Sequence, residues 1–434
     1  MVLSILVFFI FFAMFLGAPI ALVFALASFF LCSYYGIGIT GALLAAYDRA
    51  SMYVMIALPL FILLGSLMSR GGLARKLVDF VGALFGSRKG GMGDVLVITN
   101  TIFGAICGVA SSALATIGGI MIPEMEKRGY PRGYSTGLSV SSCILSLLIP
   151  PSTSMIIYGM AAKVSIPLLF LSTIVPGLLL TVLLIVINNI CVKKIPGIIV
   201  SPKVSFSEKT KSVTKATRTA IPVLILPFII LGGIYGGVFT PTEAASIAVV
   251  YVLLYGIFFS KEMNIKVIWD SIIDTGRTTG AIVIVFFFFF VLSRILILLG
   301  APDLLMNFLF KLTDNRIILL LILNLILVIT GMFMDDVSGL ILAAIIYLPV
   351  AQKLGLTPVQ FGAICGVNLG MGLITPPVAP ILYMGGIVGK VKLEEYYKVT
   401  FLSMLFAYIP VIILATYVPA VTLTLPNWFL SIIK

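Results

Sequence analysis

The sequence predicts an all-α polytopic membrane protein with two inverted repeats, each containing a re-entrant helical hairpin and a discontinuous helix. The 434 residues are 61% hydrophobic and only 10% charged, which excludes an ordinary soluble domain. Apolar stretches near the roughly 20 residues that span a bilayer recur along the chain. Two of these stretches are interrupted by proline pairs, Pro150-Pro151 and Pro376-Pro377, one in each half.

Each proline pair is expected to break its helix, because proline removes a hydrogen bond and clashes with the preceding turn. Broken backbone at membrane depth is tolerated only inside protein or beside a water-filled cavity. Matching breaks in two halves point to the binding site of a secondary transporter. The pairs lie 226 residues apart (376 − 150), and the same shift superposes Pro123 on Pro349, Gly129 on Gly355, and Ser142 on Asn368. The sequence therefore predicts an internal repeat.

A segment too interrupted to be an ordinary span precedes each break. Val95–Lys127 has a middle rich in glycine and serine, and Ile317–Val350 has a polar middle around Asp335 and Asp336. A hairpin whose polar tip reaches inward without crossing the lipid explains both middles. Two full spans joined by a short polar turn are the alternative, and length alone does not exclude them.

The expected organisation, in chain order, is N-terminal scaffold helices over 1–90, a first hairpin and broken helix over 91–165, scaffold helices over 166–300, a second hairpin and broken helix over 301–392, and a C-terminal helix over 393–434. Val2–Leu31 is expected to form the first span. The loop 193–218 is strongly basic, which predicts a cytoplasmic location. Membrane orientation explains this basic loop better than binding of nucleic acid, so no nucleic-acid partner is expected.

Catalytic chemistry has little material in this chain. It contains no histidine, and its five cysteines stand singly without a C-x-x-C spacing. Zinc sites and histidine-based acid–base catalysis are therefore disfavoured.

Asp335 and Asp336 are the strongest candidates for an ion site. An ionisable side chain in a spanning segment costs about 2.5–3.5 kcal/mol on insertion scales, so it implies a partner or a wet cavity. Sodium is a suitable partner, since hard cations take several oxygen ligands. The expected sodium ligands are Asp335 or Asp336, Ser338, Thr375 and carbonyls near Pro376 in the second half, and Ser111, Ser112 and carbonyls near Pro150 in an uncharged first-half cage. The alternative places the two aspartates at a solvated loop end.

An anionic substrate is expected beside the breaks, because the helix fragments after them direct positive dipole ends inward. Ser152 and Asn368 are candidate substrate contacts there. Arg294 follows the run Phe286–Phe290, and its guanidinium suits a substrate carboxylate. Pairing with an acid at a helix end, or snorkelling, explains Arg294 equally. The phenylalanine run is expected to face lipid. Glu243 is either a helix-start residue or a substrate contact.

Several short segments together resemble the large membrane subunit of tripartite ATP-independent periplasmic (TRAP) transporters. They are Leu58-Pro59-Leu60-Phe61, Arg70-Gly71-Gly72-Leu73, Ile149-Pro150-Pro151-Ser152, Gly237 to Ala245, Gly331-Met332-Phe333-Met334-Asp335, and Gly372-Leu373-Ile374-Thr375-Pro376-Pro377-Val378. The match runs through most of the chain.

The resemblance implies a sodium-driven importer of the ion-transporter type, in which the hairpins and broken helices form an elevator-like transport domain. It implies a small Q-type membrane subunit on a separate chain, a P-type periplasmic binding protein, surrounding lipids, and a location in the bacterial inner membrane. It also implies an organic acid substrate, commonly a C4-dicarboxylate or sialic acid. Asp335 matches the acid of the family's second hairpin, so the sodium role falls on it before Asp336.

Two departures from the family pattern affect the site. The first hairpin tip reads Cys107-Gly108-Val109 where many members have Ser-Gly-Ser, so two hydroxyls are missing. Ala379 stands where the family often has glycine.

Three rival functions remain open at this stage. A stand-alone sodium–dicarboxylate symporter shares the logic of hairpins and breaks. An intramembrane enzyme would use Asp335 and Asp336 as a proton-sharing pair, although adjacent helical residues diverge by about 100°. A passive channel is the third, and it needs no ion gradient.

Overall fold

The computed structural model describes residues 2–199 and 206–433, and every regular element in that part of the chain is helical. Among the described residues, eight helices are long and apolar enough to cross a membrane, or nine if a bent pair counts as one span. The predicted all-α polytopic fold is confirmed. Of the predicted basic loop, residues 200–205 lie outside the described residues, and residues 206–218 belong to a helix.

The first half contains, in chain order, α1 (Val2–Phe15), α2 (Ile20–Tyr35), α3 (Ile39–Ala50), η1 (Tyr53–Ile56), α4 (Ala57–Arg70), α5 (Leu73–Phe85), α6 (Gly91–Cys107), α7 (Ala110–Ala113), η2 (Leu114–Gly118), α8 (Gly119–Lys127), α9 (Arg132–Cys143), α10 (Leu145–Leu148), α11 (Thr153–Ala162) and α12 (Ile166–Val192). The second half contains α13 (Phe206–Tyr235), α14 (Pro241–Leu254), η3 (Tyr255–Ser260), α15 (Ile265–Leu298), α16 (Ala301–Leu312), α17 (Arg316–Phe333), α18 (Asp336–Leu342), η4 (Ala343–Tyr347), α19 (Leu348–Lys353), α20 (Pro358–Gly372), α21 (Pro380–Gly389), α22 (Leu393–Ser403), η5 (Met404–Tyr408), α23 (Ile409–Tyr417) and α24 (Pro419–Ile433).

The shift of 226 residues superposes helices along most of the chain. It carries α9 (132–143) to 358–369, within α20, and α6 (91–107) to 317–333, within α17. It also carries α3 and α4 together onto the single helix α15, since 39 + 226 = 265 and 70 + 226 = 296. The repeat therefore includes the scaffold helices as well as the hairpins.

Both predicted hairpins form, and an arginine closes the open end of each. In the first, α6 runs in and α7, η2 and α8 run back, with Arg128 Nη1 donating to the carbonyl of Gly86 at 3.3 Å. In the second, α17 runs in and α18, η4 and α19 run back, with Arg316 Nε donating to the carbonyl of Leu354 at 2.7 Å. The returning arms each contain a π-helical turn.

The predicted breaks also form. The segment α9–α10 is bent by 45° from α11 around Pro150-Pro151, and α20 ends before Pro376-Pro377 while α21 begins after it. The first break has 17 residues of helix and turn on one side (132–148) and ten on the other (153–162). Each hairpin tip contacts the chain beside a break, as described below, which fits re-entrant hairpins.

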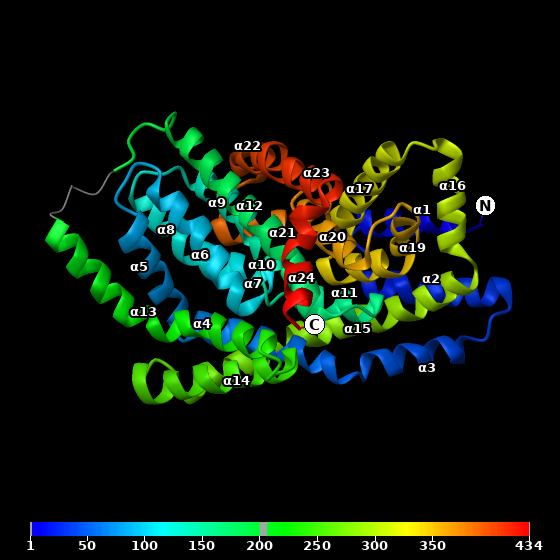
Figure 1. Cartoon of the computed structure of the whole chain (residues 1–434), viewed down its shortest axis with the longest axis horizontal. Coiled ribbons are helices and arrows are strands. Elements are labelled where there is room, and N and C mark those ends of the chain that lie inside the picture. The colour runs from blue at the N-terminus through cyan, green and yellow to red at the C-terminus, as the bar shows by residue number, and fades with distance from the viewer. Residues whose placement is uncertain (1, 200–205, 434) are drawn as a thin grey trace.

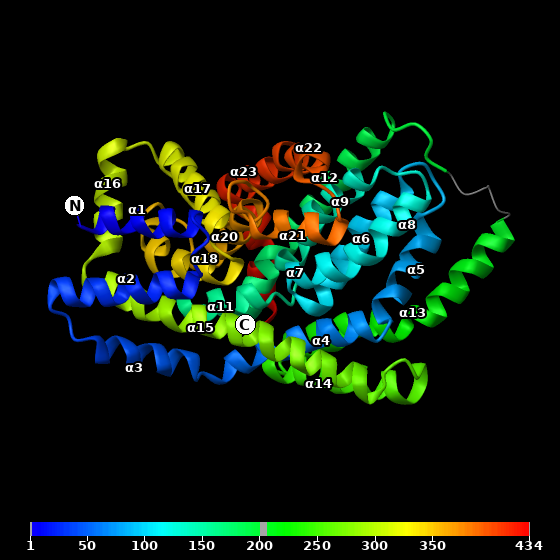
Figure 2. The ribbon, with the colours of Figure 1, turned by 180° about the vertical axis from the view of Figure 1, so that it is seen from behind.

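The helices α3, α4, α14 and α15 form a layer along one side of the molecule, with the hairpins and broken helices against it (Figures 1 and 2). Helices α5 and α13 stand at the end next to the first hairpin, and α16 stands at the opposite end beside the second (Figure 1). Residues 393–434, expected as one C-terminal helix, contain α22, η5, α23 and α24.

Two sequence expectations about the N-terminal region and the phenylalanine run were wrong. Val2–Leu31 is not one span, because the chain turns between α1 and α2 at Gly17, whose φ is +83°. The phenylalanine run does not simply face lipid, since Phe286, Phe289 and Phe290 are buried. Phe289 packs edge-on against Phe24 of α2, with ring centroids 5.0 Å apart. The 34-residue helix α15 packs against α2, α3 and α4, and the phenylalanine run contributes to its buried apolar face.

Candidate functional site

The tip of each hairpin is hydrogen-bonded to the chain just after the nearest break. The carbonyl of Gly108 accepts from the backbone N–H of Thr153 at 3.3 Å and from its hydroxyl at 2.9 Å. In the second half, the N–H of Ala379 donates to the carbonyl of Met332 at 2.9 Å. The donors Thr153 and Ala379 are related by the repeat (153 + 226 = 379), while the acceptors differ by two positions, since Gly108 shifts to Met334 (108 + 226 = 334).

Local residues determine where the helix before the first break ends and where the helix after it begins. Proline at 150 and 151 ends the helix, Ile149 and Ser152 are extended, and Ser152 starts α11 as its N-cap. The Ser152 hydroxyl accepts from the N–H of Met155 at 3.3 Å and is buried. Its oxygen therefore already satisfies an orphan donor of the helix start.

The second break carries the departure from the family pattern. Ala379 is the N-cap of α21 and has a φ of +36°, in the left-handed region that glycine adopts at least cost. Thr375 sits before the prolines, and its hydroxyl donates to the carbonyl of Met371 at 2.7 Å.

Asp335 and Asp336 lie at the second hairpin tip with different neighbours. Asp336 accepts a hydrogen bond from the hydroxyl of Ser154 in α11. Asp335 precedes α18, and its Oδ1 atom is buried without a hydrogen-bond partner among the described residues. The Ser338 hydroxyl, one turn further, is likewise buried and unpartnered there. Two neighbouring buried oxygen atoms that lack hydrogen-bond partners are suited to act as ligands of a hard cation.

The first hairpin tip has no carboxylate at the equivalent position. Val109 occupies the place of Asp335 (109 + 226 = 335), and Ser112 that of Ser338 (112 + 226 = 338). The Ser112 hydroxyl lies against Gly65 of α4, where an added Cβ would be 2.8 Å from it. Ser111 beside it is half-buried. Any cation at this tip would be held by neutral oxygens.

Two polar residues missed at the sequence level lie deeper in the first half. Asn100 of α6 donates to the Ser142 hydroxyl at 2.7 Å, and its own Oδ1 is buried and unpartnered among the described residues. The Ser146 hydroxyl is also buried and without a hydrogen-bond partner among the described residues. Asn100 could have been noticed in the sequence, because it is the only asparagine of the apolar helix α6 and Asn324 occupies a similar place in α17.

Asn368 belongs to a buried amide network. Its Nδ2 donates to Oδ1 of Asn324 at 2.9 Å, and Asn324 Nδ2 donates to the Thr416 hydroxyl at 3.0 Å. Asn368 Oδ1 has no partner among the described residues. The network therefore ties the broken helix to the hairpin and to α23, and leaves one acceptor open.

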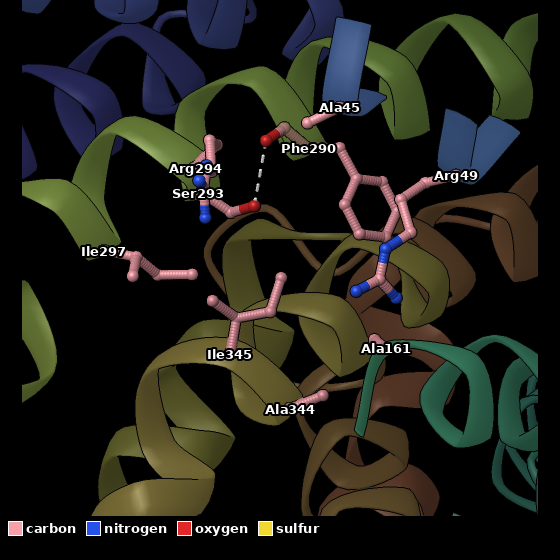
Figure 3. Close-up of a pocket in the computed structure, with 9 residues that line it drawn as sticks. All are labelled: Ala45, Arg49, Ala161, Phe290, Ser293, Arg294, Ile297, Ala344 and Ile345. Atoms are coloured by element: carbon pink, nitrogen blue, oxygen red, sulfur yellow. Dashed lines mark hydrogen bonds between the residues drawn. The ribbon is translucent and has the colours of Figure 1, made fainter. Parts of the chain in front are cut away.

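Arg294 lies away from these residues, in a cavity of about 290 Å³ lined also by Arg49 and Phe290. Helices α3 and α15 form one wall of this cavity, and Ala161 of α11 with Ala344 and Ile345 of η4 form the other (Figure 3). Ser152 and Asn368 do not line it. Arg294 makes no ion pair within the described part of the chain, so the expected pairing with a helix-end acid does not form there.

Two other acids have structural roles. Glu243 forms a capping box with Thr240 at the start of α14, which fits the helix-start interpretation. Asp94 lies in the first turn of α6. It is fully buried and accepts from Arg88, Asn188 and Asn189 at 2.6 to 2.9 Å. Within the described residues, no group of three or more cysteines and acids is arranged to hold a metal ion.

Paired re-entrant hairpins that meet paired broken helices define a secondary transporter of the membrane. Residues 6–421 match the family model of the tripartite ATP-independent periplasmic transporter, DctM component. The chain belongs to this family. It is therefore a transporter permease component, and the rival interpretation as an intramembrane enzyme is excluded.

Curated relatives align over most of their length. The uncharacterized protein YgiK of Salmonella typhimurium is 36% identical, over 87% of this chain and 85% of its own. The C4-dicarboxylate TRAP transporter large permease protein DctM of Pseudomonas aeruginosa is 34% identical, over 88% of both chains. The sialic acid TRAP transporter large permease protein SiaM of Vibrio cholerae is 32% identical, over 87% of both. The YdaH transporter of Alcanivorax borkumensis shares the fold, with a TM-score of 0.62 at 15% identity over 88% of both chains.

Proposed function

We propose that this chain is the large permease of a sodium-coupled importer of an organic acid anion. The observation that carries the proposal is the pair of buried, unpartnered oxygens at the second hairpin tip, Asp335 Oδ1 and Ser338 Oγ. A buried carboxylate oxygen without a partner is costly, and a bound cation offsets that cost. Carboxylate, hydroxyl and carbonyl oxygens are the ligands that a hard cation takes.

In this proposal, one sodium ion lies at Asp335 and Ser338 and is completed by Thr375 and carbonyls near Pro376. Asp336 contributes at a distance, through its bond to Ser154. A second ion lies in the uncharged first half, near Ser111, Ser112 and the carbonyls at Pro150. The unpartnered oxygens of Asn100 and Ser146 support a neutral cage in that half.

The substrate is proposed to be a C4-dicarboxylate or a sialic-acid-like anion. The names of the Pseudomonas and Vibrio relatives support these two classes. Asn368 is the best supported contact, because its Oδ1 is buried and has no partner among the described residues. Ser152 would act through its backbone, since its hydroxyl caps α11.

Movement is proposed to be elevator-like, with residues 91–165 and 301–392 sliding against the layer that contains α4 and α15. Small residues at this boundary, such as Gly65 against Ser112, support close sliding contact. The partners would be a small Q-type membrane subunit and a P-type periplasmic binding protein. The location would be the bacterial inner membrane, with the basic region 193–218 on the cytoplasmic side.

Uptake into proteoliposomes tests the proposal. The chain and its small subunit are reconstituted, and candidate binding proteins loaded with organic acids are added outside, with and without an inward sodium gradient. Asp335→Asn is compared with Asp303→Asn, which changes an exposed acid of α16.

The expected result is uptake that needs sodium and the binding protein, that requires at least tenfold more sodium in Asp335→Asn, and that is unchanged in Asp303→Asn. Equal uptake without sodium would remove the ion sites from the mechanism. Transport without any binding protein would instead favour a stand-alone sodium–dicarboxylate symporter.

A further inference from the structure

Two arginines from different helices face the cavity between the α3–α15 wall and the second hairpin. Figure 3 shows Arg49 and Arg294 on opposite sides of it, with Ala344 and Ile345 beneath. Arg49 comes from the last turn of α3 and Arg294 from the last quarter of α15. Of these two arginines, only Arg294 is a candidate at the level of the sequence.

The positive charge of this cavity is not balanced by acids in the described part of the chain. Arg294 is solvent-exposed at the edge of the cavity and makes no ion pair there. Arg49 uses one donor, Nη1, on the carbonyl of Met160 at 3.1 Å, and its guanidinium carbon lies 5.9 Å from the centroid of the Phe290 ring. Asp48 is exposed, does not line the cavity and pairs with neither arginine.

The remaining donors suit an anion. A guanidinium has five donors in a planar fork that matches carboxylate and phosphate oxygens. Two like charges that line one cavity repel each other, and an anion between them offsets this repulsion. About 290 Å³ corresponds to roughly ten water volumes, which is room for a small acid or for one phosphate group.

We infer that the Arg49–Arg294 cavity binds one anionic group, the carboxylate of a small organic acid or the phosphate of a lipid headgroup. The site is separate from the hairpin tips, because Asp335, Ser338 and Asn368 do not line it. A bound anion would link Arg49 of α3 to Arg294 of α15, two helices of the same wall. Only the alternative with an organic acid as the occupant rests on the proposed function. Neither alternative requires sodium coupling.

Binding in sodium-free buffer tests the inference apart from transport. The permease is placed in phosphatidylcholine nanodiscs, and the midpoint of thermal unfolding is followed against the concentration of succinate. Retention of phosphatidylglycerol is followed in parallel by native mass spectrometry. The variants are Arg49→Gln and Arg294→Gln, and the matched control is Arg277→Gln, an exposed arginine of α15 outside the cavity.

If the occupant is a soluble acid, both cavity variants raise the apparent Kd for succinate roughly ten- to one-hundredfold, and Arg277→Gln leaves it unchanged. If the occupant is a lipid, succinate has no effect, and phosphatidylglycerol is retained by the wild type and control but lost from both cavity variants. Cavity variants that match the control for both anions would overturn the inference. Sodium-dependent uptake that survives such a result would leave the proposed function intact.

Discussion

The hydroxyl of Ser154 donates a hydrogen bond to the carboxylate of Asp336, and this bond joins the helix after the first break to the second hairpin. Ser154 is fully buried, and it lies 182 residues before its partner. The adjacent Asp335 makes no such bond, and its Oδ1 is without a partner among the described residues. Asp335 is the extended N-cap residue of α18 and Asp336 is its first helical residue, so the two aspartates face different surroundings.

Ser154→Ala and Asp336→Asn should weaken the connection between the two halves. Removing one partner leaves the other buried and unpaired, which costs about 1–3 kcal/mol. A double-mutant cycle on chemical unfolding should then show coupling between the two sites. The sodium concentration for half-maximal uptake should change little in Ser154→Ala but rise at least tenfold in Asp335→Asn. A Ser154→Ala variant that needs as much sodium as Asp335→Asn would contradict this division.

Gly108→Ala should disable the first hairpin tip. Gly108 has a φ of +64°, and an added Cβ would collide with the carbonyl oxygen of Pro151. The left-handed conformation alone costs a non-glycine residue roughly 1–2 kcal/mol. We expect the loss of most uptake and a lower unfolding midpoint. Gly119→Ala in the same hairpin is the control, because its Cβ meets nothing within 4 Å.

Much of this architecture is readable from the sequence, because prolines and glycines act locally. The Pro-Pro pairs break their helices wherever the helices pack, and the shift of 226 residues follows from them. The position of the phenylalanine run, by contrast, was predicted wrongly. Five consecutive apolar residues have no periodicity, so the pattern does not distinguish lipid-facing from buried positions.

The contacts that join distant segments were not readable. Arg49 meets the carbonyl of Met160 across 111 residues, and Asn324 meets Thr416 across 92. Such pairs depend on how helices cross, and neither partner carries a local signature of the other. The candidate site was therefore predicted as two sets of residues beside breaks, while the bond between Ser154 and Asp336 that connects the halves came only from the structure.

Asn368→Ala should destabilise the second half by about 0.5–1.5 kcal/mol, because Oδ1 of Asn324 loses the donor at 2.9 Å and keeps only the Thr416 hydroxyl at 3.2 Å. Asn368→Ser should restore part of this loss, since the repeat places Ser142 at the equivalent position and its hydroxyl pairs with Asn100 at 2.7 Å. Thermal unfolding measures both variants. If Asn368 also contacts substrate, the KM for the acid should rise in Asn368→Ser even where stability is restored. An unchanged KM would leave Asn368 a purely structural residue.

The ion pair between Arg75 and Glu124 should make the stability of the first hairpin depend on pH. Arg75 of α5 donates from Nη2 to Glu124 of α8 at 3.0 Å, and this hydrogen bond holds the pKa of Glu124 below its usual range. A carboxyl whose pKa is lowered in the folded state stabilises the fold above its unfolded pKa, near 4.3. That contribution is lost as the pH falls through the lowered value.

At pH 7, Glu124→Gln should therefore be less stable than the wild type, by no more than about 1 kcal/mol because the Arg75 side chain is 49% exposed. The difference should shrink below about pH 4 as Glu124 of the wild type becomes protonated, and it should also shrink in high salt, which screens exposed charges. Urea unfolding of both proteins at pH 7 and at acid pH measures it, with Asp303→Asn as the control. If the difference in unfolding free energy instead grew on acidification, Arg75 would not be stabilising the charged form of Glu124. The contact between α5 and the first hairpin would then not depend on this ion pair.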